Sequence, residues 1–142
     1  MITCGVDIKG SEAILCLLSK TDGLFQIVDC RQVRVTLVKD NISDNIKKFQ
    51  FTLQKLFEDY QVTNVVIRER PTKGKFSGGA TGFKIEAAIQ LIDSVTVTLL
   101  NNTEIKARLK DNPLPISYAD TGLKAFQESA FSVAYAALSA SQ

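Results

Sequence analysis

The N-terminal part of the chain alternates between apolar and polar positions, which is the pattern of β-strands. Over residues 2–8 every second side chain is apolar, and the positions between them carry Thr3, Gly5 and Asp7. Residues 13–18 are almost continuously apolar, as in a strand whose two faces are both covered. We therefore predict two buried strands, with Asp7 near the end of the first.

A hairpin and a long third strand are predicted next. Thr21-Asp22-Gly23 is typical of a hairpin turn. Residues 24–38 continue as a strand, but the polar residues at 29–31 predict a bulge or bend there. The first three strands can therefore pair as an antiparallel meander.

From residue 42 onward the apolar spacing changes to steps of three and four, which predicts an amphipathic helix over residues 42–60. Ser43 or Asn41 is the expected N-cap, because a short side-chain oxygen accepts the free N–H groups of the first turn. β-Branched residues then predict a strand over residues 63–67. The remaining predicted elements are a helix through residues 85–92, a strand over 94–100, a short helix over 103–110 and a last helix over 122–138.

This order, β-β-β-α-β-α-β-α-α, predicts an α/β fold with a five-stranded mixed sheet flanked by helices. The fourth and fifth strands follow helices, and such crossovers make strands parallel, so residues 63–67 should run parallel to residues 2–8. We expect residues 1–142 to form a single domain. The side chains expected to be buried are Val6, Ile14, Leu17, Phe49, Leu53, Val66, Ile67 and Ile89.

Composition excludes several kinds of chemistry. Seventeen Lys and Arg residues against fifteen Asp and Glu give a net charge of +2, which by itself indicates no strong attraction to nucleic acid or acidic lipid. The chain has no His, so a Ser-His-Asp triad, a Cys-His pair and a His-ligated zinc are excluded. Any acid–base role falls to Asp, Glu, Lys, Tyr or Cys.

The cysteines and the hydrophobic profile predict a cytoplasmic protein. Cys4, Cys16 and Cys30 are too few and too far apart for a zinc cluster, and their odd number argues against a disulfide framework, so we expect buried free thiols. No signal-peptide pattern is expected at the N-terminus. No stretch of about 20 apolar residues is present, so no membrane span is expected.

Four segments carry a resemblance to a known fold. CGVDIKG (4–10), VVIRER (65–70), KFSGGATGFKIEAAIQL (75–91) and FQESAFSVAYAAL (126–138) resemble the corresponding segments of RuvC-type Holliday-junction resolvases. The resemblance implies a ribonuclease H-like fold. As a whole, the sequence resembles domain-of-unknown-function family 3010, a group of small bacterial proteins, and that likeness implies the fold without an established activity.

The resemblance also implies a metal site. If the first and fourth strands are adjacent, Asp7 and Glu69 end side by side, and Glu128 from the last helix completes a catalytic cluster, with Asp120 as a further candidate ligand. Carboxylates are hard oxygen ligands for Mg²⁺ or Mn²⁺. Two such ions about 4 Å apart would hold a phosphodiester and activate water.

The sequence departs from the resolvase pattern at two points. Arg68 stands where the resolvases place their glutamate, and Glu69 comes one residue later; a one-residue shift in a strand turns a side chain to the opposite face. Arg68 could then approach Asp7 and replace the cation. The last helix carries Glu128 without the second acid that resolvases place one turn away. Ordinary roles remain open alternatives: a turn former for Asp7, a solvated ion pair for Glu69 and a surface position for Glu128.

Residues 68–75 form the densest basic stretch of the chain. We predict that it binds nucleic-acid phosphates, and that an aromatic side chain next to it stacks on a base; the alternative is a solvated loop. The candidate nucleic-acid-binding residues are Arg68, Arg70, Lys73, Lys75 and Phe76.

Three functions are therefore compatible with the sequence. The first is a nuclease that depends on Mg²⁺ or Mn²⁺ and acts on structured DNA or RNA. The second is a non-catalytic module that binds nucleic acid or protein, with Arg68 in place of the metal. The third is a small structural protein that assembles as a homodimer. An Asp7–Arg68 ion pair would favour the second function over the first.

Overall fold

Six strands form one mixed sheet in the part of the chain that the computed structural model describes, residues 2–71 and 79–139. The elements are β1 (Ile2–Lys9), β2 (Glu12–Thr21), β3 (Leu24–Val28), β4 (Arg34–Thr36), α1 (Ser43–Asp59), β5 (Val62–Arg68), α2 (Ala80–Gln90), β6 (Thr96–Leu100), α3 (Asn102–Asp111) and α4 (Glu128–Ser139). The strand order is β3-β2-β1-β5-β6, and β4 also pairs with β2. β5 is parallel to β1 and β6 is parallel to β5, as predicted, and the first strands are antiparallel.

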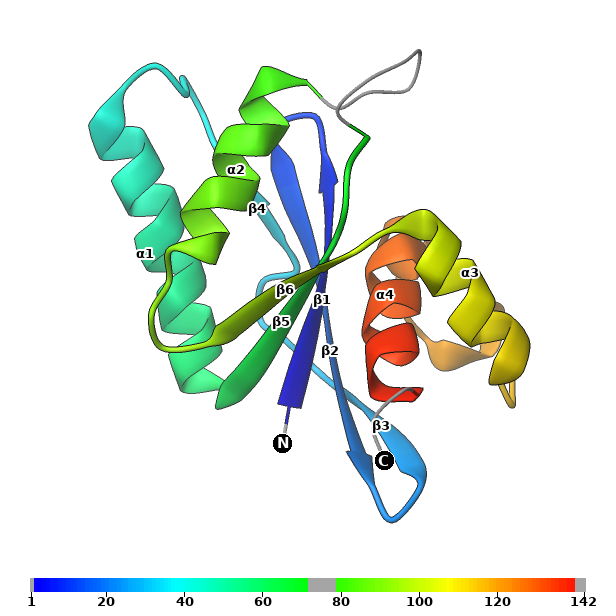
Figure 1. Ribbon diagram of the computed structural model, residues 1–142. Coiled ribbons are helices and arrows are strands. Elements are labelled where there is room, and N and C mark those ends of the chain that lie inside the picture. The colour runs from blue at the N-terminus through cyan, green and yellow to red at the C-terminus, as the bar shows by residue number, and fades with distance from the viewer. Residues whose placement is uncertain (1, 72–78, 140–142) are drawn as a thin grey trace.

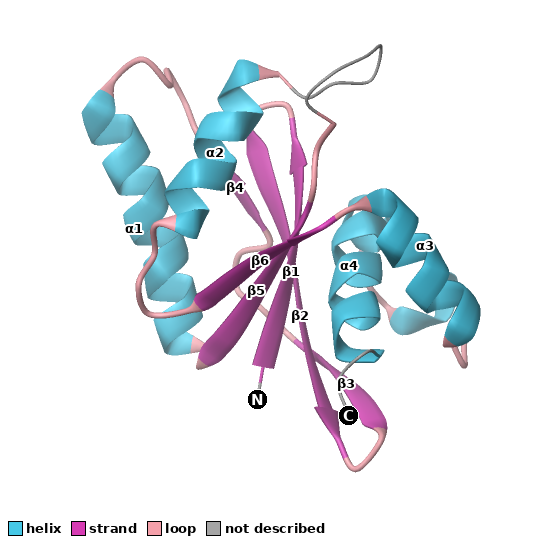
Figure 2. Cartoon of the chain, in the orientation of Figure 1, coloured by secondary structure: helices cyan, strands magenta, loops and turns pink. Residues whose placement is uncertain are grey.

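Helices cover both faces of the sheet. α1 and α2 lie on one face, and α3 and α4 lie on the other (Figures 1 and 2). All eight side chains expected to be buried are buried. None of the helices in the described ranges has the length and apolarity needed to cross a membrane.

β1 lies in the middle of the sheet and contributes to both faces. Cys4, Val6 and Ile8 pack into the core beneath α1 and α2. The intervening positions face α4, where a Cβ at Gly5 would overlap the carbonyl oxygen of Ala130. Asp7 therefore lies on the α4 face, near the carboxyl end of the strand, and is 1% exposed.

β5 shows the same alternation beside it. Val65 and Ile67 pack into the core on the α1/α2 face, whereas Val66 packs with α3 and α4. Side chains two residues apart in a strand share a face. Arg68 is therefore on the α3/α4 face, with Val66 and Asp7. Glu69 follows the alternation of Val65 and Ile67 and is on the α1/α2 face.

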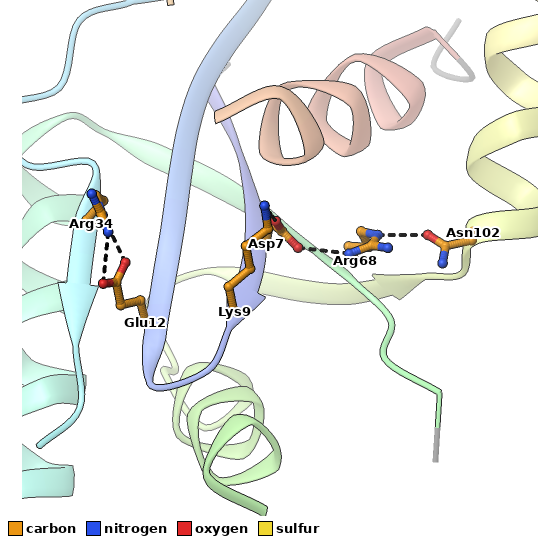
Figure 3. Close-up of polar contacts among 6 residues, drawn as sticks. All are labelled: Asp7, Lys9, Glu12, Arg34, Arg68 and Asn102. Atoms are coloured by element: carbon orange, nitrogen blue, oxygen red, sulfur yellow. Dashed lines mark hydrogen bonds and ion pairs between the residues drawn. The ribbon is translucent and has the colours of Figure 1, made fainter. Parts of the chain in front are cut away.

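The predicted third strand is broken into two. β2 has only residues 15–16 between its pairings with β3 and β4, whereas the partner segment has residues 29–33. The extra residues loop out, and the chain bends at Arg31, within the predicted segment 29–31. The chain then returns to the edge of β2, where Arg34 donates two hydrogen bonds to Glu12, of 2.9 and 3.0 Å (Figure 3). The sheet consequently has six strands rather than the predicted five.

The last helix begins later than predicted, at Glu128 rather than residue 122. Gly122 has φ +80°, a left-handed conformation that a right-handed helix cannot include. Two 3₁₀ turns, Tyr118–Thr121 and Ala125–Gln127, occupy the segment instead. The predicted cap of α1 is also wrong: Ile42 is the N-cap residue and makes no side-chain cap hydrogen bond.

The three thiols are free, as expected. Cys4 and Cys16 are buried, and burial raises the pKa of the Cys16 thiol to about 12 and that of Cys4 well above its usual range. Cys30 is half-buried and donates a hydrogen bond to the carbonyl oxygen of Gln32. Cys4 and Cys16 are therefore core side chains rather than reactive thiolates.

Candidate functional site

Three adjacent parallel strands bring polar side chains to one edge of the sheet. Val6 of β1 pairs with Ile67 of β5, so Asp7 and Arg68 each come one residue further toward the carboxyl ends. Arg68 in turn pairs with Leu100, the last residue of β6, and α3 begins two residues later at Asn102. Ligands of open α/β sheets generally bind at this edge.

Asp7 is neutralised by cations of the protein itself. The Arg68 guanidinium Nη1 donates to Oδ1 of Asp7 at 3.1 Å, and the Lys9 ammonium lies 3.8 Å from Oδ2 (Figure 3). Asp7 is buried, whereas the side chains of Arg68 and Lys9 are 37% and 58% exposed. The group thus combines one buried negative charge with two positive charges nearer the surface.

Asn102 holds the other side of the guanidinium. The Nε of Arg68 donates to Oδ1 of Asn102 at 2.8 Å. Asn102 is placed by the first turn of α3, where the side-chain oxygen of Asn101 accepts from the backbone N–H of Glu104 at 2.8 Å. The cap satisfies an otherwise free donor and fixes the start of the helix beside β5.

A pocket of about 310 Å³ opens beside Arg68, between β5, α3 and α4. Its polar wall is formed by Arg68, Asn102, Lys106, Ser129 and Ser132, and Ile105 and Leu109 form its apolar part. The lining contains two cationic side chains and no acidic one. Because Asp7 is almost completely buried, the charges that line the pocket are those of Arg68 and Lys106.

Sequence reasoning missed four of these residues: Asn102, Lys106, Ser129 and Ser132. The two serines are three residues apart on α4, so they share a helix face. The apolar residues Ala130 and Val133 mark the side of α4 that packs on the sheet, and the serines lie next to that side. No local pattern, however, indicates that α3 packs beside the serines.

Within the described residues, Glu128 forms no ion pair with Arg68 or Lys9. The carboxylate is exposed and acts on the hydroxyl of Tyr118, whose pKa is raised to about 12 by burial first and then by the nearby Cys16 and Glu128. Tyr118 packs edge-on against Phe131, with a ring separation of 5.6 Å. Glu128 is therefore close enough to the 3₁₀ segment before α4 to act on Tyr118.

Glu69 lies on the opposite face from Asp7. Its side chain is exposed, and it acts electrostatically on Glu86 of α2. The pKa of Glu86 is raised mainly by burial and then by the Glu69 carboxylate. The structure therefore does not bring Glu69 to Asp7, because of the register shift that the sequence carries.

The other predicted site residues lie elsewhere or outside the described ranges. Asp120 is exposed and accepts a hydrogen bond of 3.0 Å from the hydroxyl of Ser117. The Arg70 guanidinium lies against Gly82 and over the ring of Phe83, and it donates to the carbonyl oxygen of Gly79 at 3.3 Å. The three remaining candidates, Lys73, Lys75 and Phe76, lie outside the described residues.

The residues around Asp7 do not fit a divalent metal. Oδ2 of Asp7 is buried without a hydrogen-bond partner among the described residues, which is the one feature that suits a ligand atom. The three side chains Arg68, Lys9 and Asp7 together carry a net positive charge, however, which would repel a divalent cation at this position. Nowhere in residues 2–71 and 79–139 do three acidic or cysteine side chains gather into a group that could hold a metal ion.

Comparison with known proteins agrees with the fold. The structure is similar to RuvC of Thermus thermophilus, with a TM-score of 0.73, 11% identity, and coverage of 98% of this chain and 94% of that chain. It is also similar to T. thermophilus RuvC in complex with a Holliday junction substrate, with a TM-score of 0.69, 13% identity, and coverage of 98% and 93%. The fowlpox virus Holliday junction resolvase aligns with a TM-score of 0.50 and 11% identity over 96% and 93% of the two chains.

No curated protein matches the sequence. At these identities the structural likeness shows the fold, which is ribonuclease H-like, as the resemblance implied. Residues 1–137 match the family described as "Protein of unknown function (DUF3010)", and the chain therefore belongs to that family.

Proposed function

We propose that this protein is a nucleic-acid-binding module that uses the ribonuclease H-like fold without metal-dependent cleavage. The Asp7–Arg68 ion pair carries the proposal. It places a guanidinium beside the central carboxylate, where the nuclease hypothesis requires a divalent ion. A guanidinium supplies fixed positive charge and directed N–H donors, which suit phosphate binding, but it cannot activate water as a metal does.

The placement of the other acids supports the same proposal. Glu69 acts electrostatically on Glu86 of α2 from the opposite face of the sheet, and Glu128 acts electrostatically on Tyr118. Within the described residues, neither carboxylate forms an ion pair with Arg68 or Lys9 at the edge of the sheet. Nucleic acid is the proposed ligand because its phosphates suit this charge, and because a structural neighbour is recorded in complex with a Holliday junction.

The test measures binding and cleavage with the same DNA. A fluorescent four-way junction and a duplex of equal length are titrated by anisotropy at several salt concentrations, with and without Mg²⁺ or Mn²⁺. We expect salt-dependent binding that does not require the metal, and no cleavage products. Asp7→Asn should keep its binding, because it removes a negative charge while the amide oxygen of Asn can still accept a hydrogen bond from Arg68.

Arg68→Gln in an Asp7→Asn background removes both members of the ion pair, so no unpaired charge is left buried. This variant should bind the junction about tenfold more weakly than Asp7→Asn. Arg31→Gln is the matched control, because Arg31 pairs with Asp59 at the end of α1, away from this edge, and it should bind as the wild type does. Metal-dependent cleavage that Asp7→Asn abolishes would establish the nuclease instead, and absence of binding to either DNA at low salt would overturn the proposal.

A further inference from the structure

The pocket beside Arg68 is rich in hydrogen-bond donors that are not used within the described chain. Arg68 has five N–H donors, and two of them bind Asp7 and Asn102. Oδ1 of Asn102 accepts from Arg68, which leaves the amide NH₂ of Asn102 available. Lys106 forms no ion pair with the described residues, and the hydroxyls of Ser129 and Ser132 have no hydrogen-bond partner there.

These donors come from three elements and converge on one hollow. β5 supplies the guanidinium, α3 supplies the amide and the ammonium, and α4 supplies the two hydroxyls. The ion pair with Asp7 and the hydrogen bond to Asn102 hold the guanidinium in place before any ligand arrives. A ligand with several acceptor oxygens and negative charge would satisfy these donors together.

We infer that this pocket holds a phosphodiester group of a nucleic-acid backbone. The inference rests on the proposed function and names its contact site. Arg68 and Lys106 provide the charge, and Asn102, Ser129 and Ser132 provide further donors to the phosphate oxygens. Recognition is of the backbone rather than the sequence, because phosphate contacts carry no base information.

The apolar part of the pocket distinguishes a nucleotide from a free anion. Ile105 is 6% exposed and Leu109 is half-buried, and both line the hollow beside the polar wall. A sugar attached to the bound phosphate can pack against them. The volume of about 310 Å³ exceeds what a single phosphate fills and leaves room for this neighbour.

The first experiment tests the pocket with small probes. Backbone amide shifts of the whole protein are followed by NMR during titration with TpT, inorganic phosphate or thymidine. TpT has one phosphodiester and thymidine has none. We expect TpT to shift the amides of residues 101–106 and 129–132 more than phosphate does, and thymidine to leave them unchanged.

The second experiment compares two lysines of α3. Lys106 lines the pocket, whereas Lys110 is exposed on the same helix and does not line it. Lys106→Gln should weaken junction binding about fivefold and lower the slope of log affinity against log salt by about one, whereas Lys110→Gln should change neither. Ser132→Asp, which places a carboxylate in the pocket, should suppress the TpT shifts while the circular dichroism spectrum stays that of the wild type.

The two experiments separate the pocket from the proposed function. Junction binding by the wild type with no TpT response in the pocket would overturn this inference and leave the proposed function standing. A TpT response combined with unchanged junction binding by Lys106→Gln would also overturn it. If the pocket responds to TpT but the wild type binds neither DNA, the proposed function fails and the assignment to a nucleic-acid backbone fails with it.

Discussion

At the scale of single residues, the carboxyl group of Glu86 on α2 lies in an environment that disfavours its charged form. Oε2 of this side chain is buried without a hydrogen-bond partner among the described residues. Burial and the Glu69 carboxylate raise the pKa of Glu86, and Arg70 partly opposes them. The folded protein therefore binds the Glu86 proton more tightly than the unfolded chain does, so this group stabilises the fold at low pH and loses that contribution as the pH rises through its folded pKa.

Replacing this carboxyl should change the pH dependence of stability. Glu86→Gln removes the charge that burial disfavours, so the melting temperature should rise at pH 7. The gain should shrink as the pH falls through the folded pKa, which lies above the usual value of 4.5, and it should be absent below 4.5, because the wild-type side chain is then protonated in both states. Thermal unfolding from pH 3.5 to pH 8 measures the difference. Glu58→Gln, at an exposed position of α1, is the control, and an equal gain for both variants at pH 7 would contradict the role of burial.

At the scale of elements, the close contact between β1 and α4 sets the geometry of the site. Gly5 leaves room for the backbone of α4, since a Cβ there would overlap Ala130 and approach Ala134 Cβ within 2.8 Å. Gln127 holds the start of the same helix by donating to the carbonyl oxygen of Leu15 in β2 at 2.9 Å. These two contacts place Ser129 and Ser132 beside the end of β5.

A methyl group at position 5 should therefore destabilise the protein. Gly5→Ala forces α4 away from β1, and we expect a loss of about 1–3 kcal/mol in the free energy of unfolding. Urea denaturation measures this loss. Gly79→Ala at the N-cap of α2 is the control, because no described atom lies within 4 Å of a Cβ there and its φ of −79° suits any residue, so only the weaker cap should cost stability, about 0.5–1 kcal/mol. Equal stabilities of the two variants would mean that β1 and α4 lie further apart.

At the scale of the whole molecule, the site depends on five segments meeting at one edge of the sheet. β1 contributes Asp7, β5 contributes Arg68, the turn after β6 leads into Asn102 of α3, and α4 contributes the serines. Under the proposed function, Arg68, Ser129 and Ser132 make this edge of the sheet favour anions. Replacing them with acidic residues should make the edge favour cations instead.

Arg68→Glu/Ser129→Asp/Ser132→Asp places three carboxylates around Asp7 and the pocket. This variant should bind Mg²⁺ or Mn²⁺ with measurable heat in isothermal titration calorimetry, whereas the wild type should show none. Arg68→Gln/Ser129→Asn/Ser132→Asn changes the same positions without adding negative charge and should also show none. Comparable heats for the wild type and the acidic variant would contradict the electrostatic account of the site.

Much of the fold follows from local patterns in the chain. Alternation with period two determines which side chains of a strand share a face, and it does so without knowledge of the partner strand. For this reason the position of Arg68 one residue before Glu69 raised the Asp7–Arg68 pair as an alternative to a site of Asp7 and Glu69, and the structure shows the pair with Arg68. The start of α4 was not predictable in this way, because the apolar spacing continues through Gly122 and the 3₁₀ turns.

The sequence by itself determined the alternation of helices and strands from α1 to α3, the parallel direction of β1 and β5, and the placement of Arg68 and Glu69 on opposite faces, because each depends on spacing along one or two segments. Only the tertiary structure decided that Asn102, Lys106, Ser129 and Ser132 surround that pair. Their meeting depends on where α4 begins, how it rotates against β1, and how α3 leaves β6. Those quantities are set by packing between segments far apart in the chain, and no local pattern of residues carries them.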